Sequence, residues 1–132
     1  MSYCVNQTNG KFYMEKKDTA KALESLKTLA SEKNFKWLKT DSFENALRSF
    51  GFVLSGNKEA YTEIAYEDDF YSHSEIICLN AIAPYVKNGS FVEFAGEDGD
   101  CWRIVFNNGQ AKHINPQIVW DMPAEEIEEE RC

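Results

Sequence analysis

Three short stretches of alternating apolar and polar residues, joined by glycine turns, constrain the fold of this chain more than any other feature. They span Phe91–Ala95, Cys101–Phe106 and Gln110–Ile114. The connections between them contain Asp98-Gly99 and Asn108-Gly109. Asp-Gly and Asn-Gly are typical of tight β-hairpin turns, because the turn requires positive φ. In the middle stretch Trp102, Ile104 and Phe106 share one face, so we predict an antiparallel meander with that face buried.

The sequence before the meander predicts three helices. Apolar residues recur at helical spacing on one face of a segment that Asp18 can cap, namely Ala22, Leu23, Leu26, Leu29 and Ala30. A second helix is predicted from Asp41 as N-cap, with Glu44 three positions on, to about Phe50. Gly51 is its expected C-terminal stop. A third helix is predicted to begin at Ser74 and to end before Pro84.

Further short strands are predicted outside the meander. At the N-terminus, Tyr3–Thr8 and Lys11–Glu15 flank Asn9-Gly10, which favours a β-hairpin with a type I′ turn. Further short strands are expected over Phe35–Leu38, Phe52–Leu54, Tyr61–Tyr66 and Ile118–Trp120. The predicted fold class is therefore α+β, with an N-terminal β-hairpin, two to three helices and a C-terminal three-stranded antiparallel meander in one sheet.

The length and charge of the chain suggest how it is organised. Its 132 residues suit a single α+β domain over residues 1–122, followed by an acidic tail at 123–132 that we expect to be frayed or disordered. The net charge is −8, but the first 58 residues are net basic and the rest net acidic. Such a balance argues against a general phosphate-binding surface, so we expect no direct nucleic-acid binding.

Two acidic connections in the second part of the chain are the candidate partner-binding residues. They contain Glu67, Asp68, Asp69, Glu97, Asp98 and Asp100. We expect all six to be exposed, because like charges in short loops cannot be buried without partners. These loops either form a binding edge for a basic partner or are merely solvated. If they lie close together they make one negative surface, a point that sequence leaves open.

Two residue groups have competing interpretations. The turn at residues 97–100 could bind Ca²⁺ or Mg²⁺ through its carboxylates, but the spacing of an EF-hand loop is missing, which favours a plain hairpin turn. Arg103 either pairs with Glu93 across the hairpin or stacks on an aromatic ring, both structural roles. Alternatively, it receives an anionic ligand as the cation of an acidic region.

The sequence contains no pattern that indicates catalysis, a cofactor or a membrane span. Nucleophile elbows, P-loops, dinucleotide-binding glycines and zinc-protease helices are all missing, so we predict no enzyme. The four cysteines, Cys4, Cys78, Cys101 and Cys132, lie far apart, which favours free thiols over a disulfide framework or a metal site. The longest uncharged run is Ile76–Val86, and the N-terminus lacks a secretion signal, so we expect a cytoplasmic protein.

Part of the sequence resembles a family of small uncharacterised bacterial and phage proteins. The resemblance rests on Ala81-Ile82-Ala83-Pro84-Tyr85-Val86 with Gly89-Ser90, and on Gly96-Glu97-Asp98-Gly99 with Trp102-Arg103, Phe106 and Gly109. That family shares an "IAPYV..GS" segment and a "GEDG..WR..F..G" meander. The similarity covers about residues 76–120. It implies a bacterial or mobile-element setting and supplies no catalytic residue.

These features together predict a non-enzymatic protein–protein interaction module. We expect a small accessory or inhibitor-type protein of a bacterium, phage or mobile element, with an anti-defence or immunity role as one version. It would bind a basic protein partner through its acidic half, with the two acidic connections and Arg103 as candidate contacts. The alternative is a small-ligand or metal-binding domain that uses the 97–100 turn.

Overall fold

Groups of strands are separated by helices along the described part of the chain, which comprises residues 3–68, 70–71 and 74–116 of the computed structural model. The strands are β1 (Tyr3–Lys11), β2 (Met14–Glu15), β3 (Phe52–Gly56), β4 (Ala60–Tyr66), β5 (Phe70–Tyr71), β6 (Phe91–Gly96), β7 (Cys101–Asn107) and β8 (Gln110–Ile114). The helices are α1 (Thr19–Glu32), α2 (Phe43–Ser49) and α3 (Ser74–Ile82), with short 3₁₀ turns at Lys16–Asp18 and Ala83–Tyr85.

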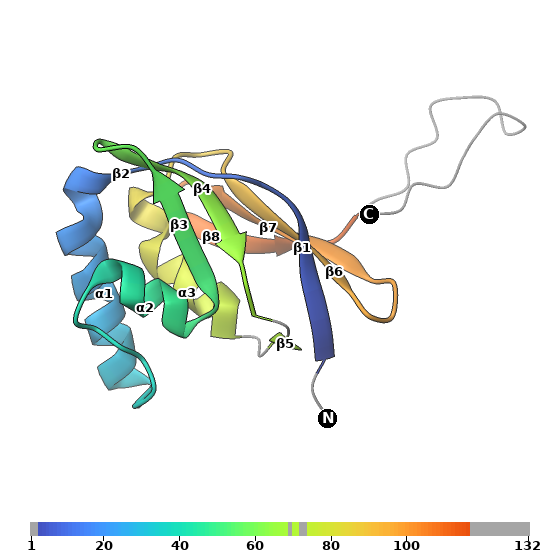
Figure 1. Ribbon diagram of the computed structural model, residues 1–132, viewed down its shortest axis with the longest axis horizontal. Helices are drawn as coiled ribbons and strands as arrows, with labels where there is room; N and C mark the ends of the chain where they lie inside the picture. Colours follow the sequence, from blue (N-terminus) through green and yellow to red (C-terminus); the bar gives the residue numbers. More distant parts are fainter. Residues whose placement is uncertain (1–2, 69, 72–73, 117–132) are drawn as a thin grey trace, which may run out of the picture.

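The strands form two antiparallel sheets with the helices gathered beside them. One sheet has the order β5-β1-β6-β7-β8 and the other the order β2-β4-β3. Helix α1 packs against α2 and α3, while α2 packs against β3 and α3 against β8 (Figure 1). This arrangement confirms the predicted α+β class.

The C-terminal meander has the predicted strands and the predicted buried face. Phe94 lies opposite Trp102, and Ile104 lies opposite His113. Trp102, Ile104 and Phe106 are 7%, 0% and 1% exposed, because they share the buried face of the sheet while alternate residues of β7 point the other way. Gly99 and Gly109 both have positive φ, as hairpin turns require. The predicted edge segment at Ile118–Trp120 and the acidic tail lie outside the described residues.

The outer edge of the meander is covered by helix α3. The backbone N–H of Ala111 in β8 donates to Oδ1 of Asn80, at 3.0 Å. An edge strand normally presents unpaired backbone groups that invite pairing with another chain. Asn80 therefore satisfies one such group from the helix that packs against this strand.

The predicted type I′ turn at Asn9-Gly10 is wrong. Strand β1 continues through both residues, and neither has positive φ. The two N-terminal strands are present, but β1 pairs with β5 and β6, whereas β2 pairs with β4. No turn forms here because the backbone of β1 pairs with β6 along this stretch. The pairing contains a bulge between Gln7 and Asn9.

The two sheets meet at strands β1 and β4, and the side chain of Gln7 joins them. Its Nε2 donates to the carbonyl oxygen of Ile64 at 3.0 Å, and its Oε1 accepts from the N–H of Tyr66 at 2.6 Å. Both partners belong to β4. One side-chain amide of β1 thus takes the place of a backbone pair between the two sheets.

The three helices lie where the sequence predicts them. Two local details differ from the prediction, the cap of α2 and the connection that follows α1. Helix α2 is capped by Ser42, whose side chain accepts from the N–H of Asn45 at 3.1 Å, rather than by Asp41. The predicted strand at Phe35–Leu38 is wrong, since these residues form turns. They follow the end of α1, where Asn34 has a φ of 56° and the N–H of Phe35 donates back to Ala30. This left-handed residue reverses the chain instead of extending it.

The cysteines differ from the prediction of four free thiols. Cys4 and Cys78 form no disulfide, as predicted, whereas Cys101 is disulfide-bonded, so the prediction is wrong for Cys101. Cys132 lies outside the described residues. A disulfide requires closeness in space rather than in sequence, so spacing along the chain did not reveal this bond.

None of the helices in the described part of the chain has both the length and the apolar character needed to cross a membrane.

Burial of Trp102 provides a direct test of the packing. Its ring stacks between Phe94 and His113, with centroids 5.6 and 5.8 Å away. Trp102→Ala should lower the free energy of unfolding by about 3–5 kcal/mol. The matched control is Trp37→Ala, which removes a ring that is 48% exposed and should cost about 1 kcal/mol. Urea unfolding followed by circular dichroism measures both, and equal losses would contradict the described core.

Candidate functional site

The two acidic connections flank the N-terminal end of strand β1. Cys4 of β1 lies opposite Phe70 of β5, and Val5 lies opposite Gly96 of β6. The N–H of Glu97 donates to the carbonyl oxygen of Cys4, at 3.0 Å. Because neighbouring strands are about 4.8 Å apart, the backbones on either side of β1 are separated by about 10 Å. Strand order therefore brings together two segments that are distant in sequence.

We call this surface the acidic rim. It consists of Glu67 and Asp68 after β4, and of Glu97, Asp98 and Asp100 between β6 and β7, all five exposed. The prediction that these carboxylates are exposed is confirmed for these five. Asp69, the sixth predicted residue, lies outside the described residues.

The turn between β6 and β7 is built by its own hydrogen bonds. Oδ1 of Asp98 accepts from the N–H of Asp100 at 3.1 Å. Gly96 donates its N–H to the carbonyl of Asp100 at 2.8 Å, and Gly99 donates to Gly96 at 3.1 Å. Gly99 has a φ of 89°, which disfavours any residue with a side chain. The geometry is that of a hairpin turn, in which Asp98 has a structural role.

The arrangement of His, Cys, Asp and Glu side chains in the described ranges does not support a metal site. In the described ranges, no three or more His, Cys, Asp or Glu side chains are arranged to hold a metal ion. The carboxylates of the rim are spread along two connections rather than turned toward one point.

Two shallow hollows lie beside Glu67 and Asp68. One, of about 550 Å³, is lined by these two acids together with Arg48, Gly51 and Val53. The other, of about 450 Å³, is lined by the same acids with Val5, Asn6, Gln7 and Tyr66. The N–H of Glu67 donates to the carbonyl of Gly51 at 2.8 Å, which fixes this connection against α2. Both hollows combine carboxylates with open space that a long side chain can enter.

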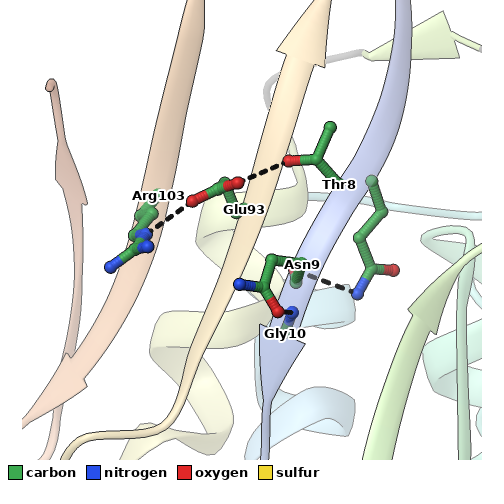
Figure 2. A network of polar contacts seen from close by, with 6 residues as sticks. Thr8, Asn9, Gly10, Glu93 and Arg103 are labelled. Carbon is green, nitrogen blue, oxygen red and sulfur yellow. Dashed lines mark hydrogen bonds and ion pairs between the residues drawn. The ribbon is translucent and has the colours of Figure 1, made fainter. Parts of the chain in front are cut away.

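Arg103 lies in the middle of β7, on the solvent face of the sheet, rather than among the carboxylates of the rim. Its Nε donates to Oε1 of Glu93 at 2.8 Å, and the hydroxyl of Thr8 donates to Oε2 at 2.7 Å (Figure 2). The guanidinium also lies over the Phe91 ring, 4.4 Å from its centroid. The predicted pairing with Glu93 and the predicted aromatic stacking are both confirmed.

This network connects three strands and alters the acidity of its carboxylate. Thr8 belongs to β1, Glu93 to β6 and Arg103 to β7. The hydrogen bonds from Thr8 and Arg103 hold the pKa of the Glu93 carboxyl below its usual value of 4.5. Because both bonds favour the charged form, ionised Glu93 stabilises the folded sheet.

A buried polar pair near the start of α3 was not foreseen from the sequence. Glu75 is only 2% exposed and accepts a hydrogen bond from the hydroxyl of Tyr66 at 2.5 Å. Cys78, one helical turn on, is fully buried, and burial, followed by the charge of Glu75, raises the pKa of its thiol well above the usual value. A thiol of that kind is a poor nucleophile, so the cluster has the character of a structural anchor.

The signal for this pair was present in the sequence but ambiguous. Glu75 follows Ser74 at the beginning of an apolar helix, a position typical of helix-start carboxylates that face solvent. Only the packing of Tyr66 against α3 turns it inward. An acid that begins a helix otherwise rich in Ile, Leu and Cys is the feature that could have indicated burial.

Comparison with known proteins returned no match to a family model, to a curated protein or to a solved structure.

Acid titration tests the role of Glu93. A carboxylate whose pKa is depressed by folding contributes stability above its unfolded-state pKa, near 4.5, and this contribution is lost as the pH falls through the folded-state value. Glu93→Gln should therefore lower the melting temperature at pH 7, and the difference from the wild type should shrink below about pH 4.5. Melting curves between pH 3 and pH 7 measure this.

Thr8→Val is the companion variant, because it removes only one of the two hydrogen bonds to Glu93. It should show a smaller difference with the same pH dependence. A difference between the wild type and Glu93→Gln that stays constant across the range would show that the charge of Glu93 has no part in stability.

Proposed function

We propose that this protein is a non-enzymatic interaction module that binds a basic protein partner through the acidic rim. One observation carries the proposal: the two acidic connections lie on either side of the same end of β1, so their five exposed carboxylates act as one surface. A surface of one charge sign attracts a partner of the opposite sign and orients it before contact.

The shape of the rim favours a protein over a small ligand. The carboxylates extend across three strands, whereas a small-molecule site is concave and concentrates a few polar groups at one point. The hollow that Glu67 and Asp68 line together with Asn6 and Gln7 is open and has no basic residue among the described residues of its lining, so it suits the end of a lysine or arginine side chain. Arginine is the residue that pairs best with carboxylates in such settings.

An accessory or inhibitor-type role follows from this mode of binding. Such a protein acts by covering a basic surface of its partner, which requires exposed charge and a rigid support but no catalytic group. The resemblance of residues 76–120 to small bacterial and phage proteins favours a bacterium, a phage or a mobile element as the setting. An anti-defence or immunity role is the version of this function that best fits a small acidic binder.

Site-specific crosslinking tests where the partner binds. A photoreactive residue placed at Glu97 of the full chain should capture a protein whose contacting peptide is rich in Lys and Arg. The same residue placed at Glu24, an exposed acid in α1, is the matched control and should capture much less. Equal capture at both positions, or contact peptides that are not basic, would overturn the proposal.

The association rate of the captured partner gives a quantitative prediction. Replacing Asp68, Asp98 and Asp100 by Asn should reduce the association rate at low salt on the order of ten-fold, because steering depends on local charge. Asn keeps the acceptor that Asp98 uses in its turn. Stopped-flow mixing at low and high ionic strength measures the effect, which should vanish at high salt.

The control for this experiment is a variant with the same total charge. Replacing Glu24, Glu32 and Glu59 by Gln also removes three negative charges, from exposed positions outside the rim. Its association rate should stay close to that of the wild type. Similar losses in both variants would show that only net charge matters, and that the rim is not the binding surface.

A further inference from the structure

A second surface presents an exposed tryptophan in the connection between α1 and α2. Trp37 is 48% exposed. Its ring is stacked on Phe35 with centroids 4.8 Å apart, and it meets Phe50 edge-on at 5.1 Å. Phe50 itself is buried. The exposed ring is therefore supported from below by two other aromatic rings.

The backbone of this connection is held in one conformation. The N–H of Phe35 donates to the carbonyl of Ala30 at 2.9 Å, and that of Leu38 donates to Phe35 at 3.2 Å. The N–H of Lys39 donates to the side chain of Ser49 at 3.0 Å, and Leu38 is buried in the core. Trp37 thus needs no reordering when it binds, which is the property that makes a tryptophan effective at an interface.

Positive charge surrounds this ring in the sequence. Lys33, Lys36 and Lys39 all belong to the same connection, and all are exposed. We call the three lysines together with Trp37 the basic–aromatic platform. It shares no residue with the acidic rim, which lies on the connections after β4 and β6.

We propose that the basic–aromatic platform binds an acidic peptide segment of a partner protein, with an apolar side chain of that segment covering Trp37. Exposed lysines that precede and follow Trp37 in the chain complement carboxylates, and the exposed indole supplies the apolar contact. A nucleic acid strand fits less well, because its charge extends beyond the platform and meets a protein of net charge −8. A short acidic segment touches the platform alone.

Selection from a displayed library of random 12-residue peptides tests the proposal, with the full chain as bait. Selected peptides should be rich in Asp and Glu around one aromatic or aliphatic residue. Their affinity, measured by fluorescence anisotropy, should fall at least ten-fold in Trp37→Ser and in Lys36→Glu/Lys39→Glu. The second variant changes only exposed side chains, so a loss of binding there does not reflect unfolding.

The matched controls are exposed residues elsewhere. Tyr13 is 40% exposed and has Lys87 over its ring, so Tyr13→Ser removes another aromatic beside a lysine. Lys11→Glu/Lys58→Glu changes the charge by the same amount as the platform variant. Both controls should bind the selected peptides as the wild type does.

Four outcomes would overturn the proposal. The first is that no acidic peptides are selected, and the second is that the selected peptides bind Trp37→Ser with the affinity they have for the wild type. The third is that a labelled 12-residue oligothymidylate binds in a Trp37-dependent way while the peptides do not. The fourth is a synthetic peptide of residues 121–132 that binds as tightly as the selected ones, which would assign the platform to the acidic segment of this chain itself.

Discussion

A single side-chain amide joins strand β1 of one sheet to strand β4 of the other. Gln7 donates from Nε2 to the carbonyl of Ile64 and accepts at Oε1 from the N–H of Tyr66, at 3.0 and 2.6 Å. This is the exchange that a backbone pair would make in a ladder. Gly10 makes it possible, because a Cβ there would lie 2.7 Å from Nε2 of Gln7. The glycine of the Asn9-Gly10 pair thus leaves room for the amide instead of forming a turn.

The candidate binding surface depends on this junction. Strand β1 pairs with β5 and β6 through its backbone and with β4 through Gln7. Tyr66 ends β4 and receives support from both sides, from Gln7 at its N–H and from the buried Glu75 at its hydroxyl. The acids of the β4–β5 connection follow directly after it. Their position beside the β6–β7 turn is therefore a consequence of how β4 is fixed to β1.

Local patterns in the sequence predicted most of the strands and helices. Long-range strand pairing decided the features that these patterns did not predict. The meander and the helices were predictable because alternation, helical spacing and Asp-Gly or Asn-Gly turns act within a few residues. The Asn9-Gly10 signal failed because pairing with β6 is worth more than a local turn preference. The exposure of the acids was likewise predictable from their charge. The position of the two acidic connections on either side of β1 was not predictable, because it follows from the strand order β5-β1-β6, which no local pattern encodes.

Amide hydrogen exchange at Tyr66 tests the junction most directly. In the wild type its N–H is bonded to Gln7, so it should exchange slowly, as ladder amides do. In Gln7→Leu, a change of similar size that removes both hydrogen bonds, exchange at Tyr66 should accelerate on the order of ten-fold more than exchange at Ile104 within the meander. Equal acceleration at both amides, or none at Tyr66, would contradict the claim that Gln7 holds the sheets together.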